Sequence, residues 1–166
     1  MSKTLLEVKN MHVSIHTDSG VIQAVRGVSF DLHESETLAI VGESGSGKSI
    51  TNKAVMGLLP VGGRIDEGEV ILNGRDIAHF SEKEMNNIRG AEVSMIFQDP
   101  LTSQNPTMTV GNQITEMLML HKPEMTPEQR KTRALELLDM VGIPNPAERF
   151  GQYPHQFSGS HRVEHD

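Results

Sequence analysis

Apolar and polar residues alternate in the first part of the chain, a pattern that predicts a β-hairpin. The alternation covers residues 6–15 and resumes over residues 21–25, and the polar sequence TDSG at positions 17–20 separates the two stretches. Successive side chains of a strand point to opposite faces, so this spacing buries one face of each strand. Apolar residues at positions 28, 30 and 32 continue the alternation and predict a further strand.

Two apolar runs predict buried strands of another kind. TLAIV at residues 37–41 is an uninterrupted run typical of a strand buried on both faces of a parallel sheet, and VSMIF at residues 93–97 predicts another buried strand. Between them we expect a helix over residues 48–59 and a strand over residues 67–72, which meets a turn at Asn73-Gly74. Ser81 and Glu84 have the spacing of a capping box, which predicts a short helix toward Arg89.

Helical periodicity dominates after residue 97. A loop is expected over residues 98–107, followed by helices over residues 110–120 and 126–141. Thr126 and Gln129 have the spacing of a second capping box, with Pro127 at the first helical position. The buried face of that helix is expected to carry Ala134, Leu137, Leu138 and Val141.

Composition narrows the class of protein. The 166 residues suffice for one folded domain, and the absence of cysteine excludes a disulfide scaffold and a thiolate zinc site. The net charge is −7 and the basic residues form no block, so nucleic acid is not expected as a partner. The first residues resemble no signal peptide, and no apolar run approaches the roughly eighteen residues of a spanning helix.

The sequence between the first apolar run and the expected helix satisfies the pattern of a phosphate-binding loop, G-x-x-x-x-G-K-[ST]. Its glycines let backbone N–H groups turn toward phosphate oxygens, and the helix start adds its positive dipole end. The lysine would neutralise the β- and γ-phosphates, and the following hydroxyl would bind Mg²⁺. A glycine-rich turn without a ligand is the structural alternative. The candidate residues are Gly42, Glu43, Ser44, Gly45, Ser46, Gly47, Lys48 and Ser49.

Four segments in order extend this motif to nearly the whole chain. They are GESGSGKS at 42–49, MIFQDPLTS at 95–103, NP at 105–106 and YPHQFSG at 153–159. Together they resemble the ATP-binding subunits of bacterial dipeptide and oligopeptide ABC transporters. The resemblance implies an α/β fold: a P-loop NTPase (ABC ATPase) core with N-terminal antiparallel strands and an α-helical subdomain, the C-terminal part of the core missing. The nucleotide-binding core would occupy about residues 1–98, the helical subdomain about 99–160 and a divergent tail 160–166.

The resemblance also implies function, cofactors and partners. ATP and Mg²⁺ would be bound between two such subunits, equal or different, where the phosphate loop of one faces the signature residues Ser158 and Gly159 of the other. Gln98 would contact Mg²⁺ or the attacking water, although an ordinary polar loop residue is the alternative. The subunit would energise peptide import through transmembrane permease subunits, and a peptide-binding protein would be an indirect partner. It would lie in the cytoplasm, on the inner face of the cell membrane.

The sequence departs from that family at the first-strand residue that would contact the nucleotide base. An aromatic residue of the first strand usually stacks on adenine, and Ile15 stands where phenylalanine or tyrosine is expected. Ile15 offers apolar contact only, which puts base affinity and selectivity in doubt. His16 could stack instead, but a solvated histidine at a strand end is the more ordinary interpretation.

The second departure concerns the signature and the residues after it. Ser160 and His161 replace the second glycine and the usual glutamine or methionine, and the chain reaches Asp166 before the family's Asp-Glu strand. We therefore expect an ABC ATPase by family, and as the alternative a truncated, non-catalytic nucleotide-binding fragment of it. An unrelated phosphate-loop kinase or GTPase is a third hypothesis.

Two other patterns have ordinary explanations. HRVEH at residues 161–165 matches the zinc-protease pattern H-x-x-E-H, yet it lies at the very end of the sequence and favours a frayed polar terminus. Methionines at positions 108, 117, 119 and 125 suit core packing, or an adaptable surface for a short helix of a transmembrane subunit.

Overall fold

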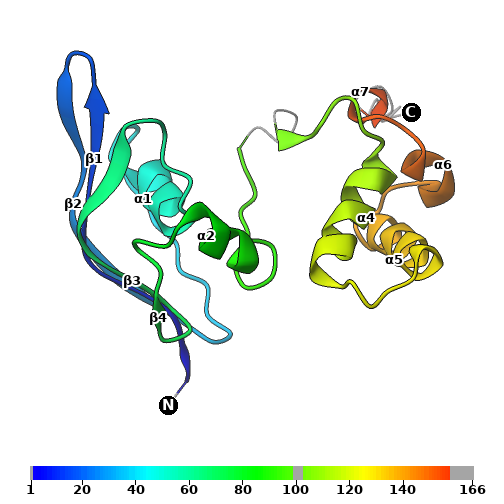
Figure 1. Ribbon diagram of the computed structural model, residues 1–166, viewed down its shortest axis with the longest axis horizontal. Helices are drawn as coiled ribbons and strands as arrows, with labels where there is room; N and C mark the ends of the chain where they lie inside the picture. The colour runs from blue at the N-terminus through cyan, green and yellow to red at the C-terminus, as the bar shows by residue number, and fades with distance from the viewer. Residues whose placement is uncertain (1, 99–102, 158–166) are drawn as a thin grey trace, which may run out of the picture. The chain divides into compact units, whose positions relative to one another are not determined.

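The computed structural model describes residues 2–98 and 103–157. The chain forms two compact units, Met1–Ser94 and Met95–Asp166 (Figure 1). No helix in the described ranges is both long enough and apolar enough to cross a bilayer.

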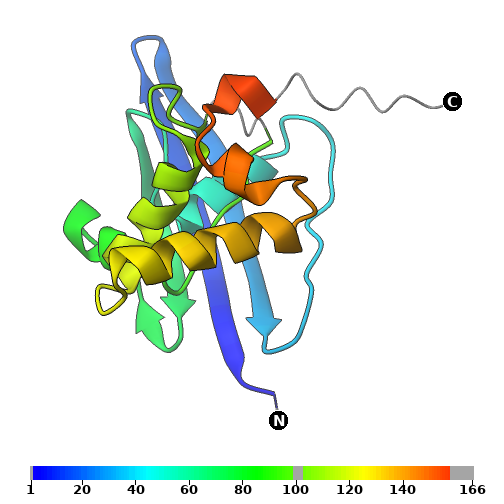
Figure 2. The same ribbon diagram turned by 90° about the vertical axis from the view of Figure 1, so that its right-hand side faces the viewer.

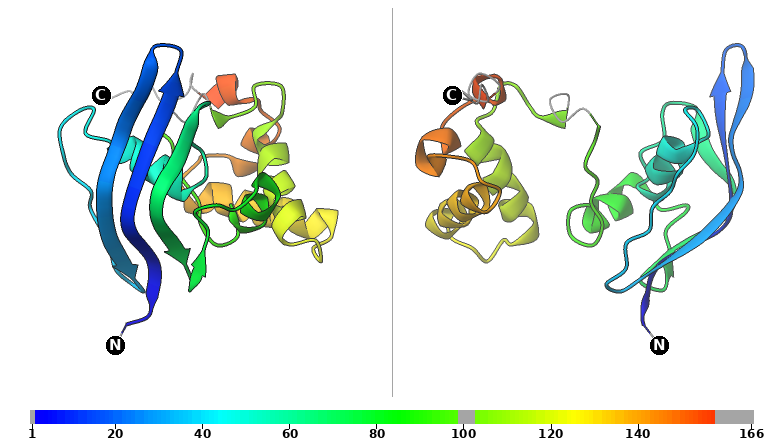
Figure 3. Two further views of the ribbon diagram at one scale, coloured as in Figure 1. Left: turned by 60° about the vertical axis from the view of Figure 1, so that its left-hand side comes forward. Right: turned by 180° about the vertical axis from the view of Figure 1, so that it is seen from behind.

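The first unit is built on an antiparallel sheet. Its strands are β1 (Thr4–Thr17), β2 (Gly20–His33), β3 (Gly63–Leu72) and β4 (Arg75–Asp76). They lie side by side in the order β2-β1-β3-β4, and the three longest can be followed in Figure 3. The hairpin expected from the alternation is confirmed, with Thr17 opposite Gly20, and residues 28–32 belong to the same long strand β2.

Two helices lie on one face of this sheet (Figures 1 and 3): α1 (Lys48–Val55) and α2 (Glu82–Ile88). The core between them is apolar because the alternating residues of β1 and β3 meet the apolar side of each helix. Val8, Met11, Val13 and Val70 are buried almost completely. The Ser81–Glu84 capping box is confirmed, and Asn73 and Gly74 take positive φ angles in the turn between β3 and β4.

The two apolar runs do not form the expected parallel strands. Residues 37–41 are not part of any strand, and Val41 is 87% exposed. In the second run Val93 makes one isolated bridge to Arg89, and Ile96 is 97% exposed. A strand buried on both faces needs a hydrogen-bonded neighbour and two covering layers. Within the described ranges neither run has such a neighbour, so its apolar character alone does not make a strand.

Helix α1 ends earlier than the expected residue 59. Its C-cap is Met56, and Gly57 follows with φ of +63°. The guanidinium of Arg89 donates to the carbonyl oxygens of Met56 and Gly57, each at 2.9 Å, and forms an ion pair with Glu82 at 2.6 Å. The positive charge therefore lies at the negative end of the α1 dipole and satisfies carbonyls that the helix leaves unpaired.

The ion pair of Arg89 also affects the titration of its partner. The guanidinium holds the pKa of the Glu82 carboxyl below its ordinary value, chiefly through the hydrogen bond. A lowered folded-state pKa adds stability at pH values above the ordinary pKa, and this stability is lost as acid protonates the carboxylate. Glu82 is mostly exposed, so the contribution is small.

The second unit is helical (Figure 2) and contains α4 (Val110–His121), α5 (Pro127–Met140), α6 (Pro146–Phe150) and α7 (Pro154–Phe157). The Thr126–Gln129 capping box is confirmed. Ala134 and Leu138 are buried, but the expectation for Val141 is wrong: it is 72% exposed. The helix ends at Met140, so Val141 has left the helical face before Gly142 turns the chain. Met117 and Met119 are about half exposed.

Close packing between α4 and α6 depends on Gly111. This residue is buried near the start of α4, and a Cβ added to it would overlap the ring of Phe150. Gly151 offers a natural comparison, because its φ is −83° and the nearest atom to an added Cβ is 3.7 Å away.

We predict that Gly111→Ala destabilises the helical unit by about 1–3 kcal/mol, because the ring of Phe150 must move to admit the methyl group. Gly151→Ala should change the free energy of unfolding by less than about 0.5 kcal/mol. Urea titration followed by circular dichroism of both variants measures the difference. Equal stability of the two variants would show that α4 and α6 do not pack this closely.

We predict that Arg89→Met lowers the free energy of unfolding by about 1–3 kcal/mol, because two carbonyls at the end of α1 lose their donor. The control is Arg64→Met, which removes an exposed ion pair to Asp66 and should cost less than about 1 kcal/mol. Thermal melts of the two variants at pH 7 test this, and a larger loss for the Arg64 variant would contradict it.

Candidate phosphate-binding site

The candidate site begins with the loop that joins residues 37–41 to α1. Gly45 and Gly47 have φ angles of +81° and +92°, in the left-handed region that favours glycine. Gly47 is also the N-cap of α1, and no side chain caps the helix there. The first backbone N–H groups of α1 therefore have no intrahelical acceptor, and they carry the positive end of the helix dipole.

Lys48 folds back over the loop. Its Nζ donates to the carbonyl oxygens of Gly42 at 2.7 Å and Glu43 at 2.5 Å, and to the hydroxyl of Ser46 at 3.2 Å. The ammonium group thus lies on the same loop as the N–H groups of the helix start. A cation and oriented N–H donors together make a site for an anion rich in oxygen atoms, such as a polyphosphate.

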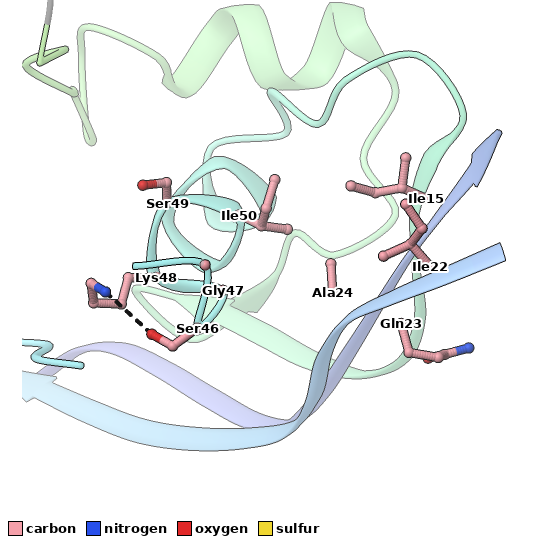
Figure 4. Close-up of a pocket in the computed structure, with 10 residues that line it drawn as sticks. Ile15, Ile22, Gln23, Ala24, Ser46, Gly47, Lys48, Ser49 and Ile50 are labelled. Atoms are coloured by element: carbon pink, nitrogen blue, oxygen red, sulfur yellow. Dashed lines mark hydrogen bonds between the residues drawn. The ribbon is translucent and has the colours of Figure 1, made fainter. Parts of the chain in front are cut away.

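A pocket of about 340 Å³ extends from this loop onto the hairpin of β1 and β2 (Figure 4). Figure 4 shows Ser46 and Lys48 at one end, Ile15 and Ile22 at the other, and Ala24 between them. The lining residues are Ile15, Ile22, Gln23, Ala24, Gly45, Ser46, Gly47, Lys48, Ser49 and Ile50.

The loop and the hairpin are joined by a close approach at Gly47. A Cβ at this position would lie 2.6 Å from the carbonyl oxygen of Ala24, well inside van der Waals contact. Only glycine therefore allows both the φ of +92° and this approach to β2. The start of α1 is consequently fixed against the strand that carries the far end of the pocket.

The structure brings part of the expected set together. Ile15 lines the same pocket as the loop residues from Gly45 to Ser49, whereas Gly42, Glu43 and Ser44 are exposed residues at the start of the loop. Gln98 is exposed and belongs to the second unit. Ser158 and Gly159 lie outside the described residues, as do Ser160, His161 and the pattern at 161–165.

His16 is directed elsewhere. It is exposed, its backbone N–H donates to the Gly62 carbonyl at 2.8 Å, and its ring Nε2 lies 3.4 Å from the Ser14 hydroxyl. Among the described residues that line the pocket, His16 is absent. These observations favour the interpretation of His16 as a strand-end residue.

The sequence did not single out Ile22, Gln23, Ala24 or Ile50 as pocket residues. The signal for the first three was the hairpin itself, since its register places Ile22 opposite Ile15. Pairing the two strands of the expected hairpin residue by residue would have assigned them. Ile50 could have been found from its position two residues after Lys48, inside the first turn of the helix.

Metal binding must be judged from the same residues. The described part of the chain holds no group of three or more histidine, aspartate or glutamate side chains able to bind a metal ion. Mg²⁺ does not need such a cage, because it usually takes one or two protein oxygens together with phosphate oxygens and water. Ser49 is exposed and lines the pocket, so its hydroxyl fits that role.

Comparison with known proteins gives the family. The model of the ABC transporter family matches residues 25–164, most of the chain. This chain belongs to the ABC transporter family. The resemblance inferred from the four sequence segments is thereby confirmed.

Individual relatives come from peptide transporters. The chain is 53% identical over 159 residues to the dipeptide transport ATP-binding protein DppD of Bacillus subtilis (strain 168), covering 95% of this chain and 47% of that protein. It is 55% identical over 159 residues to the oligopeptide transport ATP-binding protein OppD of the same organism, covering 95% of this chain and 44% of OppD. The chain thus spans about half the length of the curated relatives it matches.

Solved ABC cassettes share the fold. The dimeric structure of the bacterial ABC transporter cassette MJ0796 matches this chain with a TM-score of 0.79 and 26% identity. The match covers 93% of this chain and 64% of the MJ0796 chain. A post-hydrolysis structure of MJ0796, bound to ADP and Pi, has a TM-score of 0.76 at 25% identity, over 92% of this chain and 62% of that one. The expected fold class, an α/β ABC ATPase core with N-terminal antiparallel strands and helices, is confirmed.

We predict that Gly47→Ala damages the loop more than Gly45→Ala does. Both variants place a side chain at a positive φ, which costs about 1–2 kcal/mol, but an added Cβ at Gly45 meets nothing within 4 Å. The additional loss in Gly47→Ala therefore measures the contact with Ala24. Urea titrations of the two variants provide the comparison, and equal losses would contradict the close approach to β2.

Proposed function

We propose that this chain binds the triphosphate of ATP with Mg²⁺ through residues 42–49 and serves as an ATP-binding subunit of a peptide-importing ABC transporter. The observation that carries the proposal is the position of Lys48. Its ammonium group lies on the loop that precedes α1, beside the uncapped start of that helix.

The roles of the residues follow from their chemistry. The N–H groups of the loop and the helix start would donate to phosphate oxygens, and Lys48 would exchange its carbonyl partners for the β- and γ-phosphates. The Ser49 hydroxyl would bind Mg²⁺, which supplies further positive charge for the phosphoryl group. Gln98 would contact the metal or the attacking water, a role supported by its place in the segment that resembles the family.

The partners follow from the relatives. DppD and OppD are named as ATP-binding proteins of dipeptide and oligopeptide transport, and MJ0796 was solved as a dimer. We therefore assign this chain a second ABC ATPase subunit as partner, with Ser158 and Gly159 facing the partner's phosphate loop. Permease subunits in the membrane would be energised by this subunit, and a peptide-binding protein would supply the peptide. The place of action would be the cytoplasmic face of the membrane.

One observation favours binding without turnover as a second candidate function. The described residues that line the pocket include a cation and hydroxyl groups but no carboxylate. Phosphoryl transfer to water needs a group that orients or deprotonates the water. The described residues that line the pocket do not supply such a group. Measuring phosphate release by the purified chain, with Lys48→Ala as the blank, distinguishes the two functions.

We predict that Lys48→Ala lowers the affinity for Mg-ATP by roughly tenfold or more, because a charge-assisted contact to phosphate is lost. Lys53→Ala is the matched control, since it removes the same charge from the last turn of α1 and does not line the pocket. It should leave the affinity within about twofold. Isothermal calorimetry gives both values, and melting curves confirm that the variants are folded. Unchanged affinity in folded Lys48→Ala would disprove the proposed site.

A further inference from the structure

Residues 37–41, with the sequence TLAIV, form an apolar segment whose backbone is unpaired. Within the described ranges, none of its N–H or C=O groups makes a hydrogen bond to another backbone group. No residue of the segment takes a positive φ, so no left-handed residue interrupts its pairing as a strand. Uncharged segments rich in β-branched residues, with free backbone groups, are templates for pairing with another chain.

The segment has one partly covered face and one open face. Leu38 and Ile40 are 40% and 39% exposed, whereas Val41 is 87% exposed. Successive side chains of a strand point to opposite faces, and these exposed fractions fit that alternation. Figures 2 and 3 show the connection from β2 to α1 passing outside β2, the edge strand of the sheet. The segment therefore lies where another chain can reach it.

We propose that a second copy of this chain covers the segment. Residues 37–41 of the two copies pair in antiparallel orientation, with Ala39 of each copy opposite Ala39 of the partner subunit. Both copies use the same residues, so a two-fold axis closes the contact and the product is a dimer. This interface differs from the one proposed through Ser158 and Gly159, and its formation does not depend on nucleotide.

Charge and apolar pairing select this orientation and register. The pairs that it forms are Glu36 with Gly42, Thr37 with Val41, Leu38 with Ile40, and Ala39 with its own copy. Parallel pairing in register would instead place Glu36 against Glu36 of the partner subunit, and like charges directly opposite each other are unfavourable. A shift of the antiparallel register by two residues would place Glu36 opposite Ile40, or Leu38 opposite Gly42. Only the register centred on Ala39 keeps apolar residues together and the acids apart.

The short length of the segment sets the strength of the contact. Two paired segments of this length bury less than the roughly 1,000 Å² that marks a stable interface, so the dimer is weak. We expect the chain to be monomeric at about 1 μM and to form dimers at about 100 μM. A weak contact of known register is best detected by trapping it covalently.

The chain contains no cysteine, so single introduced cysteines report the register. Ala39→Cys should form a disulfide-linked dimer under mild oxidation, because opposite residues of an antiparallel pair have Cα atoms about 4.5–5.5 Å apart, within disulfide range. Thr37→Cys is the matched control, because Thr37 is also exposed but its two copies would lie roughly 13 Å apart along the strands. At about 100 μM chain we expect at least fivefold more cross-linked dimer from Ala39→Cys than from Thr37→Cys.

Sedimentation equilibrium of the full chain without nucleotide gives the dissociation constant of the dimer. Ala39→Lys should raise this constant by about tenfold or more, because the two-fold axis places the two lysines opposite each other. Val61→Lys is the control: Val61 is 100% exposed and lies outside the segment, so the same added charge should change the constant by less than about twofold. Circular dichroism confirms that both variants are folded.

Three results would overturn the proposal. A chain that stays monomeric at about 100 μM would show that the segment does not recruit a second copy. Equal cross-linking of Thr37→Cys and Ala39→Cys would exclude the antiparallel register, and a series of higher oligomers would exclude a contact closed by a two-fold axis. Each of these results leaves the proposed nucleotide binding intact, because the affinity for Mg-ATP is measured separately.

Discussion

The close approach of Gly47 to the Ala24 carbonyl is the constraint on which the candidate site depends. It fixes the start of α1 against β2, the strand that also carries Ile22. The N–H groups at the start of α1 and the apolar surface at the far end of the pocket therefore lie in one connected arrangement. Without this contact, a loop that precedes an eight-residue helix would be free to place its N–H groups elsewhere.

The other end of α1 is fixed by charge. Arg89 from the end of α2 satisfies the carbonyls of Met56 and Gly57, so the helix is held at both termini by different interactions. The arrangement is electrostatically consistent, because the positive dipole end points to the candidate anion site and a guanidinium lies at the negative end. A short helix with little stability of its own thereby becomes a defined part of the site.

The departure of Ile15 from the family pattern is understandable from the hairpin. An isoleucine alone is a poor substitute for an aromatic ring, but the register places Ile22 beside it, and Ile50 and Ala24 complete an aliphatic surface. Several small contacts thus occupy the position where one flat side chain is usual.

Local signals in the sequence determined much of the first unit and of the phosphate loop. The hairpin, the Asn73-Gly74 turn, both capping boxes and the loop from Gly42 to Ser49 depend on residues close together in the chain, so their patterns suffice. Tertiary structure decided what depends on distant partners. Among the residues that the structure describes, 37–41 and 93–97 have no neighbouring strands of the kind their apolar character requires. Helix α1 ends where Arg89 reaches it, and Ile22 and Ile50 join Ile15 only after folding. Burial and strand pairing each require two surfaces in contact, and the sequence of one segment specifies only one of these surfaces.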